Sequence, residues 1–91
     1  MKNKLYNLAK QTGNVLIMKA AIDEGYDIHA DKDYALCWAA DKGHTETVKL
    51  LLEHGANIHA KDDLALRWAA EKGHTETVKL LKEWMNKKKV A

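Results

Sequence analysis

A 21-residue segment occurs twice in this chain, and the second copy begins thirty residues after the first. Residues 33–53 and 63–83 are identical at all but four positions. The differing pairs are Tyr34/Leu64, Cys37/Arg67, Asp41/Glu71 and Leu52/Lys82. The same period also aligns Gly13 with Gly43 and Gly73, so the chain divides into units 1–31, 32–61 and 62–91. A fixed period of this length predicts a solenoid, in which each unit buries its apolar face against its neighbours.

The apolar residues within a unit predict two helices. In the second unit, apolar residues spaced i, i+3, i+4 lead up to Gly43, which can end a helix because glycine readily adopts the left-handed conformation. A second stripe of the same spacing leads to Gly55. Applied to all three units, this pattern predicts six helices, the last of which ends near Asn86. We expect the first and last units to act as polar caps of a short stack.

Composition and charge exclude several classes of protein. Hydrophobic residues make up 46% and charged residues 31% of the 91 residues, which is typical of one folded soluble domain. No apolar run approaches the roughly 20 residues of a membrane span, and no secretory leader is evident. The lone Cys37 cannot form an internal disulfide, which favours a reducing, cytoplasmic location.

The net charge of +2 is concentrated at the C-terminal end. Residues 82–91 hold four lysines and one glutamate, which gives +3, and residues 1–81 hold eleven basic and twelve acidic side chains, which gives −1. The body of the chain therefore lacks the broad basic face of a nucleic-acid-binding protein. We expect no nucleic-acid or membrane partner.

The stretch AADKGHTETVKLLLEHGANIHA, residues 39–60, resembles the ankyrin repeat, and the similarity extends over almost the whole chain. The resemblance implies an all-α, ankyrin-type solenoid of three helix-turn-helix repeats with a concave face that binds other proteins. The repeat is about three residues shorter than is usual for the family, and the missing residues fall where the family has its β-hairpin finger. We therefore expect short loops instead of hairpins.

The family's T-P-L-H motif is absent, because YALC stands at 34–37 and LALR at 64–67. In its place we expect Asp33 and Asp63 to cap the first helix of their units. Such short repeats are similar to those of many viral and intracellular-bacterial proteins, so the cytosol of a host cell is a second possible location.

The five histidines and Cys37 do not predict a metal site. His29 and His59 occupy equivalent loops, and equivalent residues of stacked repeats lie about 10 Å apart, too far to share a zinc ion. Acidic and basic residues recur with the period, as in Glu46, Lys49 and Glu53, which is typical of a solvated, salt-bridged outer helix face. No phosphate loop or nucleophile with a neighbouring base is present, so we expect no catalysis, no cofactor and no small-molecule substrate.

The predicted partner-binding surface is the loop and first helix of the second and third units. These positions hold three of the four differences between the near-identical copies. The candidate residues are Lys32, Asp33, Tyr34, Trp38, Asp41, Lys42, Asp62, Asp63, Leu64, Arg67, Trp68, Glu71 and Lys72. Trp38 and Trp68 can serve either as exposed anchors or as packing between repeats.

Two functions follow from these features. The first is a non-catalytic protein-interaction module that acts as an inhibitor, a neutraliser or an adaptor. The alternative is a self-associating or consensus-like structural scaffold without a different partner. Either function is compatible with a monomer or a weak homodimer.

Overall fold

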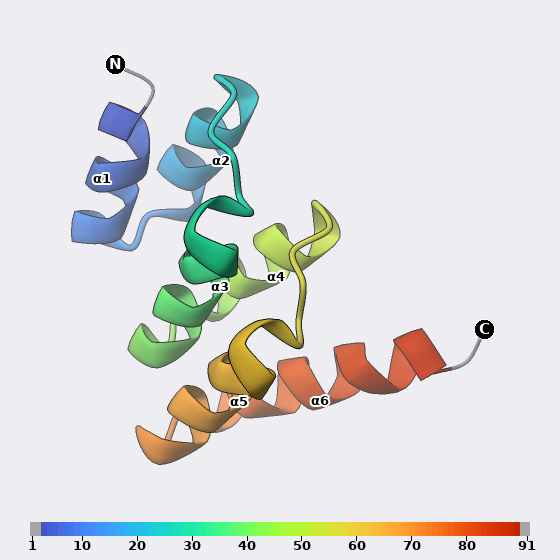
Figure 1. Ribbon diagram of the computed structural model, residues 1–91. Coiled ribbons are helices and arrows are strands. Elements are labelled where there is room, and N and C mark those ends of the chain that lie inside the picture. Colours follow the sequence, from blue (N-terminus) through green and yellow to red (C-terminus); the bar gives the residue numbers. More distant parts are fainter. Residues whose placement is uncertain (1–2, 90–91) are drawn as a thin grey trace.

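The computed structural model describes residues 3–89, which form six helices joined by short turns (Figure 1). The helices are α1 (Asn3–Thr12), α2 (Val15–Asp23), α3 (Ala30–Lys42), α4 (Thr45–Glu53), α5 (Ala60–Glu71) and α6 (Thr75–Lys89). No strand occurs within this described range, so the predicted all-α solenoid with short loops in place of hairpins is confirmed. The last helix ends three residues beyond the predicted Asn86.

The helices form two rows (Figure 1). The inner row contains α1, α3 and α5, and the outer row contains α2, α4 and α6, with α3 packed on α5 and α4 packed on both α2 and α6. Small side chains such as Ala35, Ala39 and Ala69 are fully buried along the inner row. Between the rows lie larger buried residues such as Met18 and Leu51. Burial of each large aliphatic side chain contributes roughly 1.5–3 kcal/mol.

In the first and second units, the turn between the two helices receives a histidine from the next unit. Gly43 ends α3 in the left-handed conformation, with φ 74°. A Cβ placed on it would lie only 2.6 Å from Nδ1 of His74, so the ring occupies the space that the missing side chain leaves. His74 Nε2 also donates a hydrogen bond to the carbonyl of Asp41, at 2.8 Å. Gly13 and His44 repeat the close approach one unit earlier.

The loops before the first helices of the second and third units contain a feature that the sequence did not predict. Residues 31–33 and 61–63 wind in the left-handed sense, with φ between 55° and 61° and ψ between 34° and 52°, before the right-handed part of α3 and α5 begins. None of these residues is glycine. A left-handed residue with a side chain costs roughly 1–2 kcal/mol, although aspartate tolerates the conformation better than most. Four of the six residues are aspartates.

Several hydrogen bonds stabilise these left-handed turns. The amide of Asp33 donates to the carbonyl of His29 at 3.2 Å, and the carboxylate of Asp33 lies 2.5 Å from Nδ1 of the same histidine. Asp63 and His59 repeat both contacts. The expectation that the two aspartates cap a helix is therefore wrong, because their carboxylates bind histidine rings. In the third unit, Arg67 also donates to the carbonyls of residues 61 and 62.

Candidate functional site

The two left-handed turns and the first helices that follow them form one continuous surface. We call residues 31–42 and 61–72 the ridge. Since α3 packs directly against α5, equivalent residues of the two units lie side by side along it. All thirteen residues predicted for partner binding belong to the ridge.

The structure divides these thirteen residues by accessibility. The exposed ones are Lys32, Lys42, Asp62, Arg67, Glu71 and Lys72. Those of intermediate exposure are Tyr34, Asp41, Asp63, Leu64 and Trp68. The buried ones are Asp33 and Trp38. Eleven of the thirteen candidate residues thus retain some accessible surface.

The two equivalent tryptophans differ in burial. Trp38 is 6% exposed and belongs to the core, where its ring centroid lies 5.3 Å from that of His44. Trp68 has intermediate exposure. The neighbouring alanines show the same contrast, since Ala40 is fully buried and Ala70 is exposed. Within residues 3–89, α5 packs against α3, and no other first helix packs on the far side of α5. Trp38 therefore packs between repeats, whereas part of the Trp68 side chain remains accessible to a partner.

Two polar contacts hold ridge side chains in place. Lys72 and Asp41 form an ion pair of 3.0 Å between α5 and α3, with the lysine half exposed. Exposed pairs of this kind contribute about 0–1 kcal/mol, so this one orients the side chains more than it stabilises the fold. Arg67 donates its hydrogen bonds to the left-handed turn of its own unit. Its guanidinium remains exposed at the surface.

An aromatic cluster with two lysines extends from the ridge onto the first unit, and the sequence did not predict that these residues meet. The rings of Tyr6 and Tyr26 stack with centroids 4.1 Å apart. Lys10 Nζ lies 5.5 Å from the centroid of Tyr6 and 5.2 Å from that of Tyr34, and Lys61 Nζ lies 5.6 Å from Tyr34. A signal was available, because each of these residues departs from the thirty-residue period.

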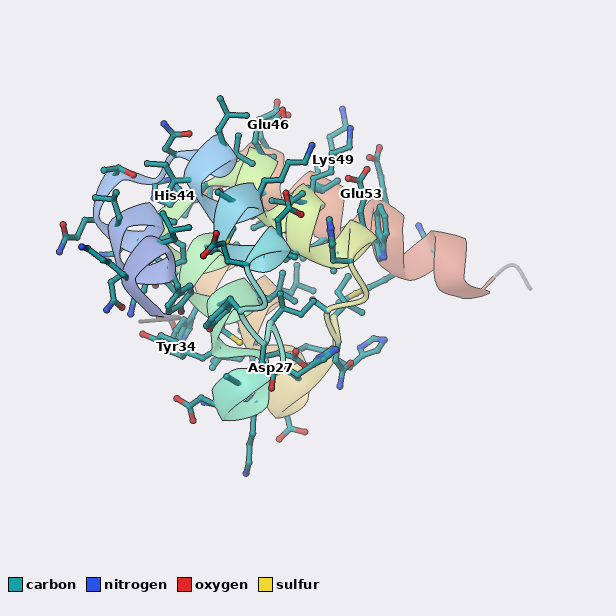
Figure 2. All side chains as sticks on the ribbon, turned by 90° about the horizontal axis from the view of Figure 1, so that it is seen from above. Asp27, Tyr34, His44, Glu46, Lys49 and Glu53 are labelled. Carbon is teal, nitrogen blue, oxygen red and sulfur yellow. The ribbon has the colours of Figure 1, made fainter. Side chains whose placement is uncertain are left out.

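The opposite side of the molecule is formed by the outer helices. Figure 2 shows Glu46, Lys49 and Glu53 there, away from Tyr34. A shallow hollow of about 300 Å³ between α2 and α4 is lined by these three residues with Val15 and Leu50. None of the ion pairs found within residues 3–89 lies on this face, so the predicted salt bridges are not formed.

Burial shifts the pKa values of titratable groups near the core. Burial raises the pKa of the Cys37 thiol, which therefore stays protonated at neutral pH. Burial, followed by the charges of Lys42 and His74, lowers the pKa of His44 and keeps its ring neutral. Within the part of the chain that the structure describes, no three histidine, cysteine, aspartate or glutamate side chains converge as metal ligands would.

Comparison with known protein families gives a match over nearly the whole chain. The family model described as ankyrin repeats, in three copies, matches residues 5–90. Comparisons with curated proteins and with solved structures returned no match. Among residues 3–89, no helix is both long enough and apolar enough to span a bilayer. Ankyrin repeats are generally protein–protein interaction modules and typically lack catalytic activity. Residues 5–90 cover nearly all of the sequence, and the chain therefore belongs to the ankyrin repeat family.

Proposed function

We propose that this chain is a non-catalytic module that binds another protein through the ridge. The observation that supports it is the placement of the differences between the second and third units. Three of the four differing pairs are on the ridge, and five of their six residues are at least partly accessible, with only Cys37 fully buried. The shared residues between them supply the core. Variable surface on an invariant framework is what a binding scaffold requires.

Trp68 is the proposed anchor of this surface. Tryptophan and arginine are enriched among the residues that dominate interface energies, and both Trp68 and Arg67 are accessible on α5. Trp38 supports the surface from within the core. A single domain of this kind acts by occluding or tethering its partner, as an inhibitor, a neutraliser or an adaptor, in the cytoplasm or in the cytosol of a host cell. It uses no small-molecule substrate, nucleic acid or membrane.

The test is capture of the partner from an extract of the source cell with immobilised chain and its variants. Trp68→Ala and Arg67→Ala should each weaken capture, by roughly 30-fold if the residue is a dominant contact. Lys49→Gln and Lys79→Gln, on the outer helices, are the matched controls and should leave it unchanged. Urea unfolding of each variant separates lost binding from lost stability. Equal capture by the wild type and both ridge variants would refute the ridge assignment.

A second candidate function, self-association, is favoured by a different observation. Leu8 and Leu16 are large apolar residues that are 43% and 72% exposed, and both belong to the first unit. Leu16 stands where the other units carry Glu46 and Glu76. If Leu16 contributes to an interface between two copies, Leu16→Glu should abolish concentration-dependent dimerisation in sedimentation velocity. A wild-type chain that stays monomeric at millimolar concentration would exclude this function.

A further inference from the structure

We propose that Tyr34, Lys10 and Lys61 form a binding site for a carboxylate, and that the partner presents an acidic segment to the ridge. The inference rests on the proposed function and names the chemistry of the partner. It also adds Lys10 and Lys61, which lie outside the predicted surface, to the residues that carry recognition.

The geometry places two cations on one ring. Lys10 Nζ lies 5.2 Å from the centroid of Tyr34, and Lys61 Nζ lies 5.6 Å from it. Both distances are within the range of a cation–π interaction. The lysines come from α1 and from the left-handed turn at the start of α5, and Tyr34 comes from α3, so the site draws on three helices. Two like charges beside one ring repel each other, and an anion bound near both relieves that repulsion.

Neither ammonium group forms an ion pair with a carboxylate of residues 3–89. The ion pairs found in residues 3–89 are His29–Asp33, His59–Asp63 and Lys72–Asp41. Asp31 precedes the site on the same turn, but its carboxylate lies in no ion pair with either lysine within 4 Å. The positive charge of Lys10 and Lys61 is therefore available to a carboxylate from outside.

The site is also held in place before any partner arrives. Lys10 contacts Tyr6 as well as Tyr34, and Tyr6 is buried and stacked on Tyr26. A lysine whose chain is fixed between two rings loses less conformational freedom on binding than a fully solvated one. Lys61 is exposed, which leaves the approach to Tyr34 open on that side.

The residues of this site are the ones that the repeat does not require. Lys10 occupies the position of Ala40 and Ala70, and Lys61 occupies that of Asp31. Tyr34 stands where the third unit has Leu64. The framework can accommodate a different residue at each of these positions, yet the three unusual side chains meet at one point. The site therefore occurs once in the three units, as a specificity element should.

The nearby acidic residues select a short acidic segment over a long polyanion. Asp27, Asp31 and Asp62 lie on the loops and turns around the site and are exposed. Their charge would repel a nucleic acid that runs across the surface. A protein segment with one or two carboxylates can instead be placed at the lysines alone.

The experiment uses the whole chain and an N-acetylated, C-amidated peptide of two glutamates between two glycines. Two-dimensional NMR follows the Tyr34 ring and the side-chain resonances of Lys10 and Lys61 at low salt. We expect saturable shifts at these three residues, and none with the equivalent two-glutamine peptide. The double variant Lys10→Gln/Lys61→Gln should weaken binding about fivefold or more, as two exposed charge contacts would.

Two further variants keep the result interpretable. Tyr34→Leu introduces the residue of the third unit, so it preserves the fold while it removes the ring, and it should also weaken binding. Lys49→Gln/Lys79→Gln removes two lysines from the outer helices and should leave binding unchanged. Glutamate-induced shifts that are absent, or that occur at Lys49 and Lys79 instead, would overturn the proposal. So would equal binding of inorganic phosphate or a thymidine oligonucleotide.

The proposed site and the proposed function fail in different ways. If the glutamate peptide does not bind at Tyr34 but Trp68→Ala still weakens partner capture, only the carboxylate site is refuted. If the peptide binds as expected but no ridge variant affects capture, the function assigned to the ridge is refuted and the carboxylate site stands.

Discussion

The contact between Gly43 and His74 lies between two repeats. Adding a single methyl group at Gly43 measures how much this contact contributes to the free energy of unfolding. Gly43→Ala places a Cβ within 2.6 to 2.9 Å of three atoms of the His74 ring. Gly73 is the matched control, because it has the same left-handed conformation, φ 77° against 74°, and a Cβ added there would have no atom within 4 Å. Both substitutions carry the same backbone cost, and only one carries the clash.

The expected magnitudes follow from these contacts. An alanine in the left-handed region costs about 1–2 kcal/mol, partly offset by reduced freedom of the unfolded chain, so Gly73→Ala should destabilise by about 1 kcal/mol. Gly43→Ala adds overpacking of about 1–3 kcal/mol. If the ring moves away, it also loses the hydrogen bond to the Asp41 carbonyl, worth about 1 kcal/mol. The total is about 3–5 kcal/mol, a large share of the stability of a small domain.

Urea unfolding followed by far-ultraviolet circular dichroism measures both variants. A double-mutant cycle with His74→Ala isolates the contact, since Gly43→Ala should cost only about 1 kcal/mol once the ring is gone. The reasoning is refuted if Gly43→Ala and Gly73→Ala destabilise equally, or if the cost at Gly43 persists without the His74 ring.

Three further outcomes are expected. Burial lowers the pKa of His44 below 6.5, so as the pH falls the unfolded chain binds a proton before the folded chain does. The free energy of unfolding should therefore fall as the pH drops from about 6.5 toward the lower pKa of the folded state. Urea midpoints measured from about pH 7.5 to 5 should show this pH dependence in the wild type and a weaker one in His44→Asn. Trp38→Ala should cost about 3–5 kcal/mol and Trp68→Ala distinctly less, since only Trp38 is in the core; equal losses would show that Trp68 is as tightly packed. Deletion of residues 62–91 should abolish the cooperative thermal transition, because it removes the unit that covers α3 and α4, and a sharp transition would contradict nearest-neighbour stabilisation.

The helices and their pairing could be predicted because they depend on local signals that recur. Gly13, Gly43 and Gly73 mark equivalent turns, and the apolar spacing around them is helical in every unit. In a stack where each unit contacts only its neighbours, the period of the sequence is also the period of the structure. The six helices could be predicted from that period together with the helical spacing of the apolar residues.

The remaining features depend on contacts between units, which a single repeat does not reveal. Trp38 and Trp68 have nearly the same local sequence, and their burial differs because only the first is followed by another described unit. The approach of Lys10 and Lys61 to Tyr34 joins residues from the three inner helices α1, α3 and α5. Aligning the three units by their thirty-residue period identifies the positions that vary, but it does not show which of those side chains lie close together in the fold.

The left-handed turns could not be predicted for a different reason. Local propensity argues against three consecutive left-handed residues that carry side chains. In the folded chain, the histidine and the aspartate four residues later, such as His29 and Asp33, bond through both their side chains and their backbones across the turn. The aspartates stand out in the sequence, but their spacing alone points to a helix end as their partner and not to a histidine ring.

At the six positions of those left-handed turns, the residue types that stabilise the backbone differ from those that stabilise an ordinary right-handed helix. Glycine weakens an ordinary helix, yet at Lys32 or Lys61 it would remove a steric penalty, and so would the mirror-image form of lysine. A β-branched residue such as valine would be worse there than in any other exposed part of the first helices. The repeat is about three residues shorter than is usual for the family, and a left-handed turn stands where the family has a hairpin. Within that turn, the residues that fit best are those that favour the left-handed conformation.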